Sequence, residues 1–495
     1  MVAHLGSLGQ SSRGRWALAT LAGVLNGIGF IQYGMVSLVA NVPLLLALRH
    51  SPSMMEAGFL AGWVGFLGGV HIYGIINYGW FLLLGFSLYT ASQMVIYGLL
   101  FRYLWGGHRA WLNVLLPAVI WGVTEWVRTV GPLCMPASYI GNIADGPWAR
   151  PWLILAAWTG GLGVSTLVAL VQSSVFHALV GTVKERKWAF IAFVGIGILV
   201  AFNWAFMPTA SSESVKVIAV QGGLANSQYH AAEADPAAMQ DVVRTYETLT
   251  QQAYERGADF VVWPETAIRA PILRTPELSA RLVPERGSKS ILLAGLLSSD
   301  HRGRQYNTMV ALGPNGQVMD EYRKIRLVPS AEGHLTAGQE HRAITGGIVP
   351  VGVMICLESV YPDMARRLVE SGAQFLVVAS NDAGFGHSPI THHMTNRAIV
   401  RAVETQRWLL RVGQAGVSAL IGPSGKIHQR MDLFEAGLLE GTLKARTNQT
   451  VYVRWGDWWI GVLLFFLGLA FIARWRESSL KKTVENVDEP KDGYE

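Results

Sequence analysis

The sequence predicts a multi-pass α-helical membrane domain of about eight transmembrane helices, joined to an extracytoplasmic α/β domain. Three observations support this fold class. Charged residues make up only 15% of the 495 residues, whereas about 25% is typical of soluble domains. Long uncharged runs fill most of residues 1–206, and another lies near the C-terminus. Between them, residues 213–454 are polar and alternate short Val- and Ile-rich runs with amphipathic stretches.

The membrane domain is predicted from the uncharged runs. A transmembrane helix needs about 20 mostly apolar residues, and no water-soluble core requires so many runs of this length. Seven spans over residues 1–206 precede the polar block and one, within 455–475, follows it. The second span is short, so its boundary with the first stays open. The predicted spans are 16–33, 35–48, 57–75, 79–101, 111–128, 153–180, 188–206 and 456–474.

The distribution of Lys and Arg predicts the orientation, because basic residues concentrate in cytoplasmic loops. If every span crosses the membrane, most of the Lys and Arg residues in the loops fall on one side of it. Both termini are then cytoplasmic and the polar block lies outside. The tail over 476–495 is charged and contains Pro490, so we expect it to be disordered and cytoplasmic. The residues on the predicted cytoplasmic side are Arg13, Arg15, Arg49, Arg102, Arg109, Lys184, Arg186, Lys187, Arg474, Arg476, Lys481 and Lys482.

Charge and cysteine content exclude several other classes. The net charge of +6 is explained by the loop residues, and no nucleic-acid-binding motif is present. The first apolar run lacks a cleavage site followed by a polar start, so it is interpreted as a retained helix. The two cysteines, Cys134 and Cys356, could form a disulfide outside the cell. We expect both to be free, because Cys134 lies in a loop by the membrane and Cys356 ends an apolar run.

The polar block predicts one mixed α/β domain over residues 213–454. Apolar runs of strand length alternate with helical periodicity, and Gly-Pro turns mark two hairpins. Predicted strands are 215–220, 260–263, 291–294, 349–355 and 375–378; predicted helices are 236–256 and 362–371; the hairpins are 307–322 and 408–421 with the segment from 426 onward.

Three motifs within this block carry a complete set of groups for acyl chemistry. They are Trp263-Pro264-Glu265, Tyr322-Arg323-Lys324 and Ile355-Cys356-Leu357-Glu358. Each reactive side chain follows an apolar run, and sites gather at the carboxyl ends of strands in open α/β sheets. Glu265 is the candidate base, Lys324 the stabiliser of the developing oxyanion and Cys356 the nucleophile that forms a thioester.

Two further carboxylates are candidates for supporting roles. Glu358 lies two residues past Cys356 and would share the face of the thiol on an extended chain, where it could hold Lys324 or a backbone group. Glu332 lies eight residues past Lys324 and could meet the substrate. Taken singly, each such residue is more often structural: a buried cysteine acts as a small hydrophobe, and a carboxylate or ammonium is usually solvated. Their combination in one block favours catalysis.

We expect neither a metal nor any other cofactor. His387, His392 and His393 cluster beyond the strand at 375–378, but a zinc site needs more ligands than these provide in one place.

The three motifs and the flanking spans resemble the nitrilase (carbon–nitrogen hydrolase) superfamily, and within it the membrane-embedded apolipoprotein N-acyltransferases. The resemblance implies an α-β-β-α sandwich for the polar block and the roles of base, lysine and nucleophile for Glu265, Lys324 and Cys356. Glu332 and Glu358 match further carboxylates of that family. Other matching residues are Gln221-Gly222, Asn381-Asp382, Phe385-Gly386, Arg401 to Glu404, Arg411, Trp121, Glu125, Trp126 and Arg128.

The chain departs from the family pattern at three places. Gly384 replaces the usual Trp, Gly223 replaces a common Asn, and Met135-Pro136-Ala137 stands where Phe-Pro-Trp is usual. None of these is a catalytic position. They bear on contacts with substrate, for which Asn381, Gly384, Phe385 and Trp263 are the candidates.

The resemblance implies a ping-pong acyl transfer in the bacterial cytoplasmic membrane. The donor would be a membrane phospholipid, with phosphatidylethanolamine expected, and the acceptor the N-terminal amine of a diacylglyceryl-cysteine on an apolipoprotein. We expect a monomer with its site on the outer face and no nucleic-acid partner. The alternatives are a membrane-tethered amidase or nitrilase, an N-acyltransferase for another amine, and a non-catalytic binding relative. The intact Glu–Lys–Cys set argues against the last.

Overall fold

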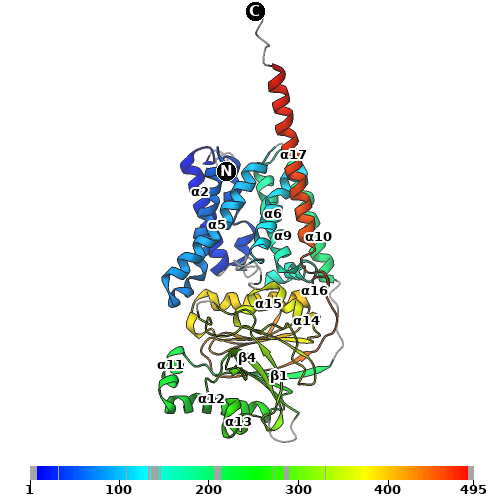
Figure 1. Ribbon diagram of the computed structural model, residues 1–495. Helices are drawn as coiled ribbons and strands as arrows, with labels where there is room; N and C mark the ends of the chain where they lie inside the picture. Colours follow the sequence, from blue (N-terminus) through cyan, green and yellow to red (C-terminus); the bar gives the residue numbers. More distant parts are fainter. Residues whose placement is uncertain are drawn as a thin grey trace, which may run out of the picture.

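The computed structural model describes residues 8–31, 33–106, 109–131, 134, 144, 147–205, 213–270, 272–283, 289–328 and 331–488. Helices from both ends of the chain form one half of the molecule, and the two sheets with their helices form the other (Figure 1). The predicted division into a membrane part and an α/β part is therefore confirmed. The departure noted at 135–137 lies outside the described residues.

Most described helices of the membrane part coincide with predicted spans. Six stretches are long and apolar enough to cross a membrane: 12–31, 54–78, 80–104, 110–127, 156–180 and 459–479. Large apolar side chains of these stretches, such as Phe59 and Phe465, remain exposed, as is typical of helices that face lipid. The helices are α2 (Ser12–Ile31), α3 (Val42–Arg49), α4 (Met54–Gly69), α5 (Trp80–Leu104), α6 (Ala110–Val127), α8 (Arg150–Leu153), α9 (Ala156–Val180), α10 (Val183–Ala205) and α17 (Trp459–Asp488), with 3-10 helices η1 (Gly34–Leu38), η2 (Val70–Tyr78) and η3 (Pro147–Ala149).

Two expectations for this part differ from the structure. The span predicted at 35–48 is broken between η1 and α3, which together run only over 34–49. The tail predicted to be disordered from 476 instead continues α17 to Asp488. Helix-forming Glu and Lys residues, with no Gly or Pro before Pro490, allow the helix to continue. α10 lies where the seventh span was predicted, and the total of eight spans stays a prediction.

The α/β domain contains two sheets. One has the strand order β11-β1-β2-β3-β4-β5 and the other β10-β9-β8-β7-β6. Each sheet contains three adjacent parallel strands. In the first sheet antiparallel strands flank them on both sides, whereas in the second they continue from β8 and leave β6 at the other edge. The strands are β1 (Ser214–Gln221), β2 (Phe260–Val262), β3 (Ile291–Ser299), β4 (Gln305–Leu312), β5 (Val318–Arg323), β6 (Val351–Ile355), β7 (Phe375–Ser380), β8 (Leu409–Gly413), β9 (Ser418–Ile421), β10 (Ile427–Met431) and β11 (Gly437–Lys444).

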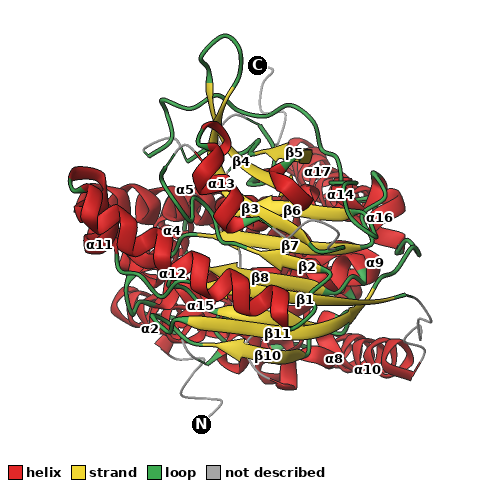
Figure 2. Cartoon of the chain, turned by 90° about the horizontal axis from the view of Figure 1, so that it is seen from below, coloured by secondary structure: helices red, strands yellow, loops and turns green. Residues whose placement is uncertain are grey.

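The two sheets pack face to face between two layers of helices (Figures 1 and 2). Phe260 of β2 meets Phe375 of β7 across the interface, with ring centroids 5.4 Å apart. Such a core joins sheets whose inner faces are both apolar. The helices of the first sheet are α11 (Asn226–Ala234), α12 (Pro236–Glu255) and α13 (Pro276–Leu282), and those of the second are α14 (Pro362–Glu370) and α15 (Pro389–Thr405). This is the α-β-β-α sandwich that the resemblance implied.

The second predicted hairpin and the last strand needed correction. The stretch 408–421 is divided into β8 and β9, because residues 414–417 form a turn that reverses the chain. β11 was not predicted. It pairs antiparallel with β1 along its whole length, from Ser214 opposite Lys444 to Gln221 opposite Gly437. Its neighbour is thus more than 200 residues away in sequence, and no local pattern encodes such a pairing.

The helix α15 joins the α/β domain to the membrane helices, contacting α9 and η2. Glu404 accepts a hydrogen bond from the backbone amide of Gly161 in α9 at 2.6 Å. His393 forms a contact with the carbonyl oxygen of Phe30 in α2. Because these groups are buried, leaving any of them without its partner would be costly. The two parts therefore have a defined mutual position.

We predict that Trp263→Ala destabilises the α/β domain by about 3–5 kcal/mol. Trp263 is fully buried, its indole N–H donates to Thr250 at 2.9 Å, and its ring packs on Tyr246. Thermal unfolding of the detergent-solubilised protein would measure the loss. Trp455→Ala is the matched control, because Trp455 is exposed. Equal melting temperatures for the two variants would contradict this assignment.

Candidate active site

Cys356 lies in a strained turn directly after β6, an edge strand of the second sheet. The strand ends at Ile355, and the short 3-10 helix η6 (Cys356–Val360) begins at the cysteine. Cys356 has a φ of 52°, in the left-handed region that non-glycine residues seldom adopt. Such strain, of about 1–3 kcal/mol, gathers at functional sites. The sharp turn lifts the thiol out of the strand, as a nucleophile requires.

Glu265 follows β2 in a second strained turn. Its neighbour Thr266 has a φ of 45°. The turn lies against Gly295 of β3, where a Cβ atom would be 2.1 Å from the carbonyl oxygen of Pro264. The amide of Ala267 donates to the carbonyl of Gly295 at 3.0 Å. Only glycine allows this close approach, so Gly295 helps to position the carboxylate of Glu265.

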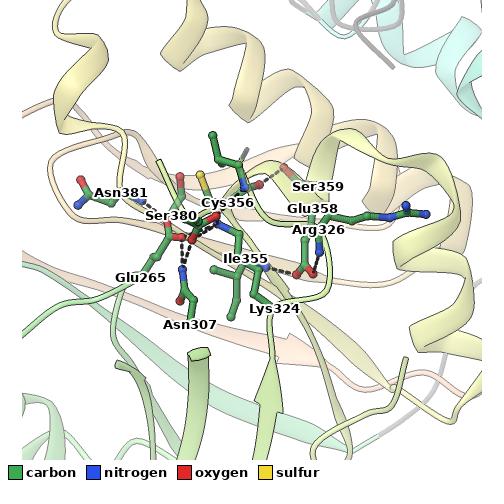
Figure 3. A network of polar contacts seen from close by, with 12 residues as sticks. Glu265, Asn307, Lys324, Arg326, Ile355, Cys356, Glu358, Ser359, Ser380 and Asn381 are labelled. Carbon is green, nitrogen blue, oxygen red and sulfur yellow. Dashed lines mark hydrogen bonds and ion pairs between the residues drawn. The ribbon is translucent and has the colours of Figure 1, made fainter. Parts of the chain in front are cut away.

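Lys324, the residue after β5, connects two carboxylates. Its Nζ lies 2.8 Å from Glu265 Oε1 and 2.9 Å from the carboxylate of Glu332. The ammonium is only 1% exposed, and a buried charge persists only when it is paired and hydrogen-bonded. Figure 3 shows Glu265, Lys324 and Cys356 brought together from three separate segments. The motifs singled out in the sequence therefore meet in space.

Asn307 of β4 is part of this network and was not predicted. Its Nδ2 donates to Glu265 Oε1 and to Glu332 Oε1, both at 2.7 Å (Figure 3). The amide thus separates two carboxylates that would otherwise repel each other. The sequence gives little signal for this role, because the neighbouring Thr308 of the same strand is polar and buried as well.

Glu358 holds backbone groups and does not contact Lys324. Its carboxylate accepts from the amides of Ile325 at 2.6 Å and Arg326 at 3.2 Å, from the amide of Ile355 at 2.7 Å, and from the hydroxyl of Tyr322 at 2.9 Å. It thereby ties the chain after Lys324 to the strand before Cys356. The expected supporting role is met through the backbone, on a 3-10 helix and not on an extended chain.

The electrostatics of the site favour a thiol at rest. Burial raises the pKa of Cys356 above its ordinary value, Glu265 raises this pKa further, and Lys324 lowers it. Burial alone would lower the pKa of Lys324, but Glu265, Cys356 and Glu332 raise it above its usual range. Burial also raises the pKa of Glu358 to about 7, against the four donors that favour its ionised form. The Cys356 proton must therefore leave as the thiol attacks.

The residues expected to contact substrate lie in different surroundings. The backbone amide of Asn381 donates to Glu265 Oε2 at 3.1 Å. Gly384 and Phe385 form the 3-10 helix η7 (Ala383–Phe385), next to Tyr78 at the end of η2. Trp263 instead belongs to the core beside α12. We therefore assign Trp263 to the support of the Glu265 turn and not to a substrate contact.

A buried ion pair supports the turn that carries Asn381. Arg411 of β8 binds Asp382, and the hydroxyl of Ser380 also contacts that carboxylate. Both charged side chains are fully buried, so removal of one would leave the other without compensation. The negative charge of Asp382 also raises the pKa of Cys356. The pair thus holds one wall of the site.

Both cysteines are free, as expected. Cys134 donates to the carbonyl of Thr129 and is partly buried. Among the described residues, no group of three or more His, Cys, Asp or Glu side chains could hold a metal ion.

Comparison with known proteins agrees with the fold. The Carbon-nitrogen hydrolase model matches residues 224–452, and the model of the Apolipoprotein N-acyltransferase N-terminal domain matches residues 22–174. An Apolipoprotein N-acyltransferase of Geobacter metallireducens is 26% identical, over 89% of this chain and 92% of that protein. One of Nostoc sp. is 27% identical, over 83% and 87%. Nit3 of Saccharomyces cerevisiae, from the nitrilase superfamily, aligns at 19% identity with a TM-score of 0.39, covering 48% of this chain and 93% of Nit3.

The sandwich and the matched residues 224–452 define a carbon–nitrogen hydrolase domain. In this chain it is joined to a multi-pass membrane domain. The Apolipoprotein N-acyltransferase N-terminal domain model matches most of that membrane domain. Relatives named apolipoprotein N-acyltransferase match nearly the whole chain. Over most of its length the chain is thus similar to proteins named apolipoprotein N-acyltransferase.

We predict opposite effects of two substitutions on alkylation of Cys356 by iodoacetamide. Glu265→Gln removes a negative charge that raises the thiol pKa, so alkylation at pH 8 should accelerate several-fold. Lys324→Met removes the positive charge that lowers it, so alkylation should slow by a similar factor. Both variants are made in a Cys134→Ala background and measured by mass spectrometry. Changes of the same sign in both variants would refute the assigned electrostatics.

Proposed function

We propose that this protein transfers an acyl chain from a membrane phospholipid to the N-terminal amine of a diacylglyceryl-cysteine on an apolipoprotein. The similarity to proteins named apolipoprotein N-acyltransferase supports this reading. The observation that carries the chemistry is the convergence of Glu265, Lys324 and Cys356, with Lys324 Nζ 2.8 Å from Glu265 Oε1. Base, oxyanion stabiliser and nucleophile are thus held in one site.

In the first half-reaction Glu265 accepts the proton of Cys356 as the sulfur attacks the ester carbonyl of the phospholipid. Lys324 stabilises the oxyanion of the tetrahedral intermediate. When the intermediate collapses, the C–O bond breaks, a carbon–sulfur thioester remains, and the proton passes from Glu265 to the departing lysophospholipid oxygen. We expect phosphatidylethanolamine as the donor, as the resemblance to the acyltransferases implies.

In the second half-reaction the amine of the acceptor attacks the thioester carbonyl. Glu265 takes a proton from the attacking nitrogen, an amide bond forms, and the sulfur leaves and is reprotonated. Glu332 and Asn307 keep Lys324 and Glu265 aligned during both steps. Asn381 supplies its backbone amide to Glu265.

Both substrates are lipids, so the site must be reached from the bilayer. The side-chain amide of Asn77 in η2 donates to the carbonyl oxygen of Gly384 at 3.1 Å, which joins the site directly to the membrane part. The basic loops favour the outer face of the cytoplasmic membrane for this site, and one chain contains all catalytic groups, which favours a monomer.

We predict an acyl adduct on Cys356 after incubation of the purified protein with phosphatidylethanolamine. Intact-protein mass spectrometry should show the mass of one acyl chain, and addition of a diacylated lipopeptide should remove it with formation of a triacylated product. Cys356→Ala should form neither adduct nor product, while Cys134→Ala should behave as the wild type.

Two outcomes would overturn this proposal. Activity of Cys356→Ala comparable to wild type would remove the thioester mechanism. Release of ammonia or amine from small amides in the absence of phospholipid, without any acyl adduct, would instead indicate a membrane-tethered amidase. Transfer from the adduct to another amine, but not to the lipopeptide, would change the acceptor and leave the mechanism intact.

A further inference from the structure

Gly384 has no room for a side chain, because Tyr78 of the membrane part occupies that space. A Cβ atom on Gly384 would lie 1.8 Å from the hydroxyl oxygen of Tyr78 and 3.0 Å from Nδ2 of Asn226. The preceding residue Asn77 donates to the carbonyl oxygen of Gly384 at 3.1 Å. The end of η2 is therefore inserted where the α/β domain has only backbone.

The position of η2 is closely fixed by its packing against the α/β domain. A Cβ atom on Gly74, one turn before Tyr78, would lie 2.0 Å from Oγ of Ser388 at the start of α15. Gly74 of η2 lies against Ser388, and Tyr78 of η2 lies against Gly384. These two close approaches fix the distance of η2 from the α/β domain and its rotation about its own axis. The direction of the Tyr78 side chain is thus determined by the interface between the two parts.

Tyr78 packs on the segment that borders the site. Its ring meets Phe385 edge-on, with centroids 5.3 Å apart, and Phe385 lies four residues after Asn381, whose backbone amide donates to Glu265 Oε2 at 3.1 Å. Tyr78 is 49% exposed, whereas Lys324 and Glu265 behind it are buried. An aromatic ring that is half-accessible beside the nucleophile offers an apolar surface to whatever binds there.

The surface around Tyr78 continues toward the membrane with the same character. Ile76, Trp80 and Phe81, all near the end of η2, are also exposed and apolar. Hydrocarbon gains free energy from burial against such a surface in proportion to the area covered. A fatty acyl chain fits this surface, and a polar head group does not.

We propose that Tyr78 is a positioning residue of the membrane part, whose ring, together with Phe385, holds a lipid acyl chain beside Cys356. The inference rests on the proposed function, since it assumes that a lipid is the donor. Gly384 has the complementary role of leaving space for the Tyr78 ring. The wall of the active site is therefore completed by a side chain from outside the α/β domain.

The test is a double-mutant cycle on formation of the Cys356 thioester in mixed micelles of phosphatidylethanolamine, with the full-length protein. Tyr78→Ala should raise the apparent KM for phospholipid about tenfold and change the limiting rate less than about threefold, because the chemical groups are untouched. Tyr78→Phe keeps the ring and should restore a KM near wild type. Gly384→Ala should displace Tyr78 and raise the KM as Tyr78→Ala does. The double variant should be no worse than either single variant.

Tyr73→Ala is the matched control, because Tyr73 belongs to the same helix and has similar exposure. Its KM should equal that of wild type. A wild-type KM for Tyr78→Ala, or a loss confined to the limiting rate, would overturn the role of Tyr78. Additive losses in the double variant would overturn its link to Gly384. Absence of any thioester on wild-type protein would instead overturn the proposed function itself.

Discussion

The structure of the site depends on the burial of one ammonium among groups that can compensate it. Lys324 is almost completely excluded from solvent, and two carboxylates neutralise it. Two carboxylates this close would repel each other without the bridging amide of Asn307. Each member of the network thus requires the others, and each comes from a different segment. The fold must bring β2, β4 and β5 of the first sheet against β6 of the second before any of these charges can be buried at acceptable cost.

Much of this arrangement follows from local sequence. Apolar runs before Glu265 and Cys356 predicted strands, and strand ends in α/β sheets predict a common edge. Helices α12 and α14 and the first hairpin were also predicted from their periodicity and turn residues. Glu265, Lys324 and Cys356 could be proposed as a triad because each was predicted to follow such a run. Glu332 could be proposed only as a neighbour of Lys324 in sequence, and its contact with that ammonium became visible in three dimensions.

The features that escaped prediction share one physical property, which is dependence on distant partners. β11 is a strand because β1 lies beside it. Asn307 matters because two carboxylates converge on its side chain. In the sequence, Gly384 appeared only as the replacement of a Trp that is usual in the family. The packing of η2 against the α/β domain shows that Tyr78 occupies the space that a side chain at Gly384 would need. Trp263 stood next to catalytic residues in sequence, yet successive residues of a strand face opposite sides, and its ring points into the core.

The pairing of β1 with β11 also constrains how the protein can be made. The opening strand of the α/β domain enters the outer compartment first under the proposed topology, and its antiparallel neighbour enters last. Until the ribosome has delivered nearly the entire domain, an edge of the first sheet stays without a partner. Exposed strand edges invite pairing with foreign chains. Folding of this protein should therefore be most vulnerable during export. Truncation shortly before Gly437 removes the partner of β1, so it should impair folding of the α/β domain as well as removing the C-terminal residues.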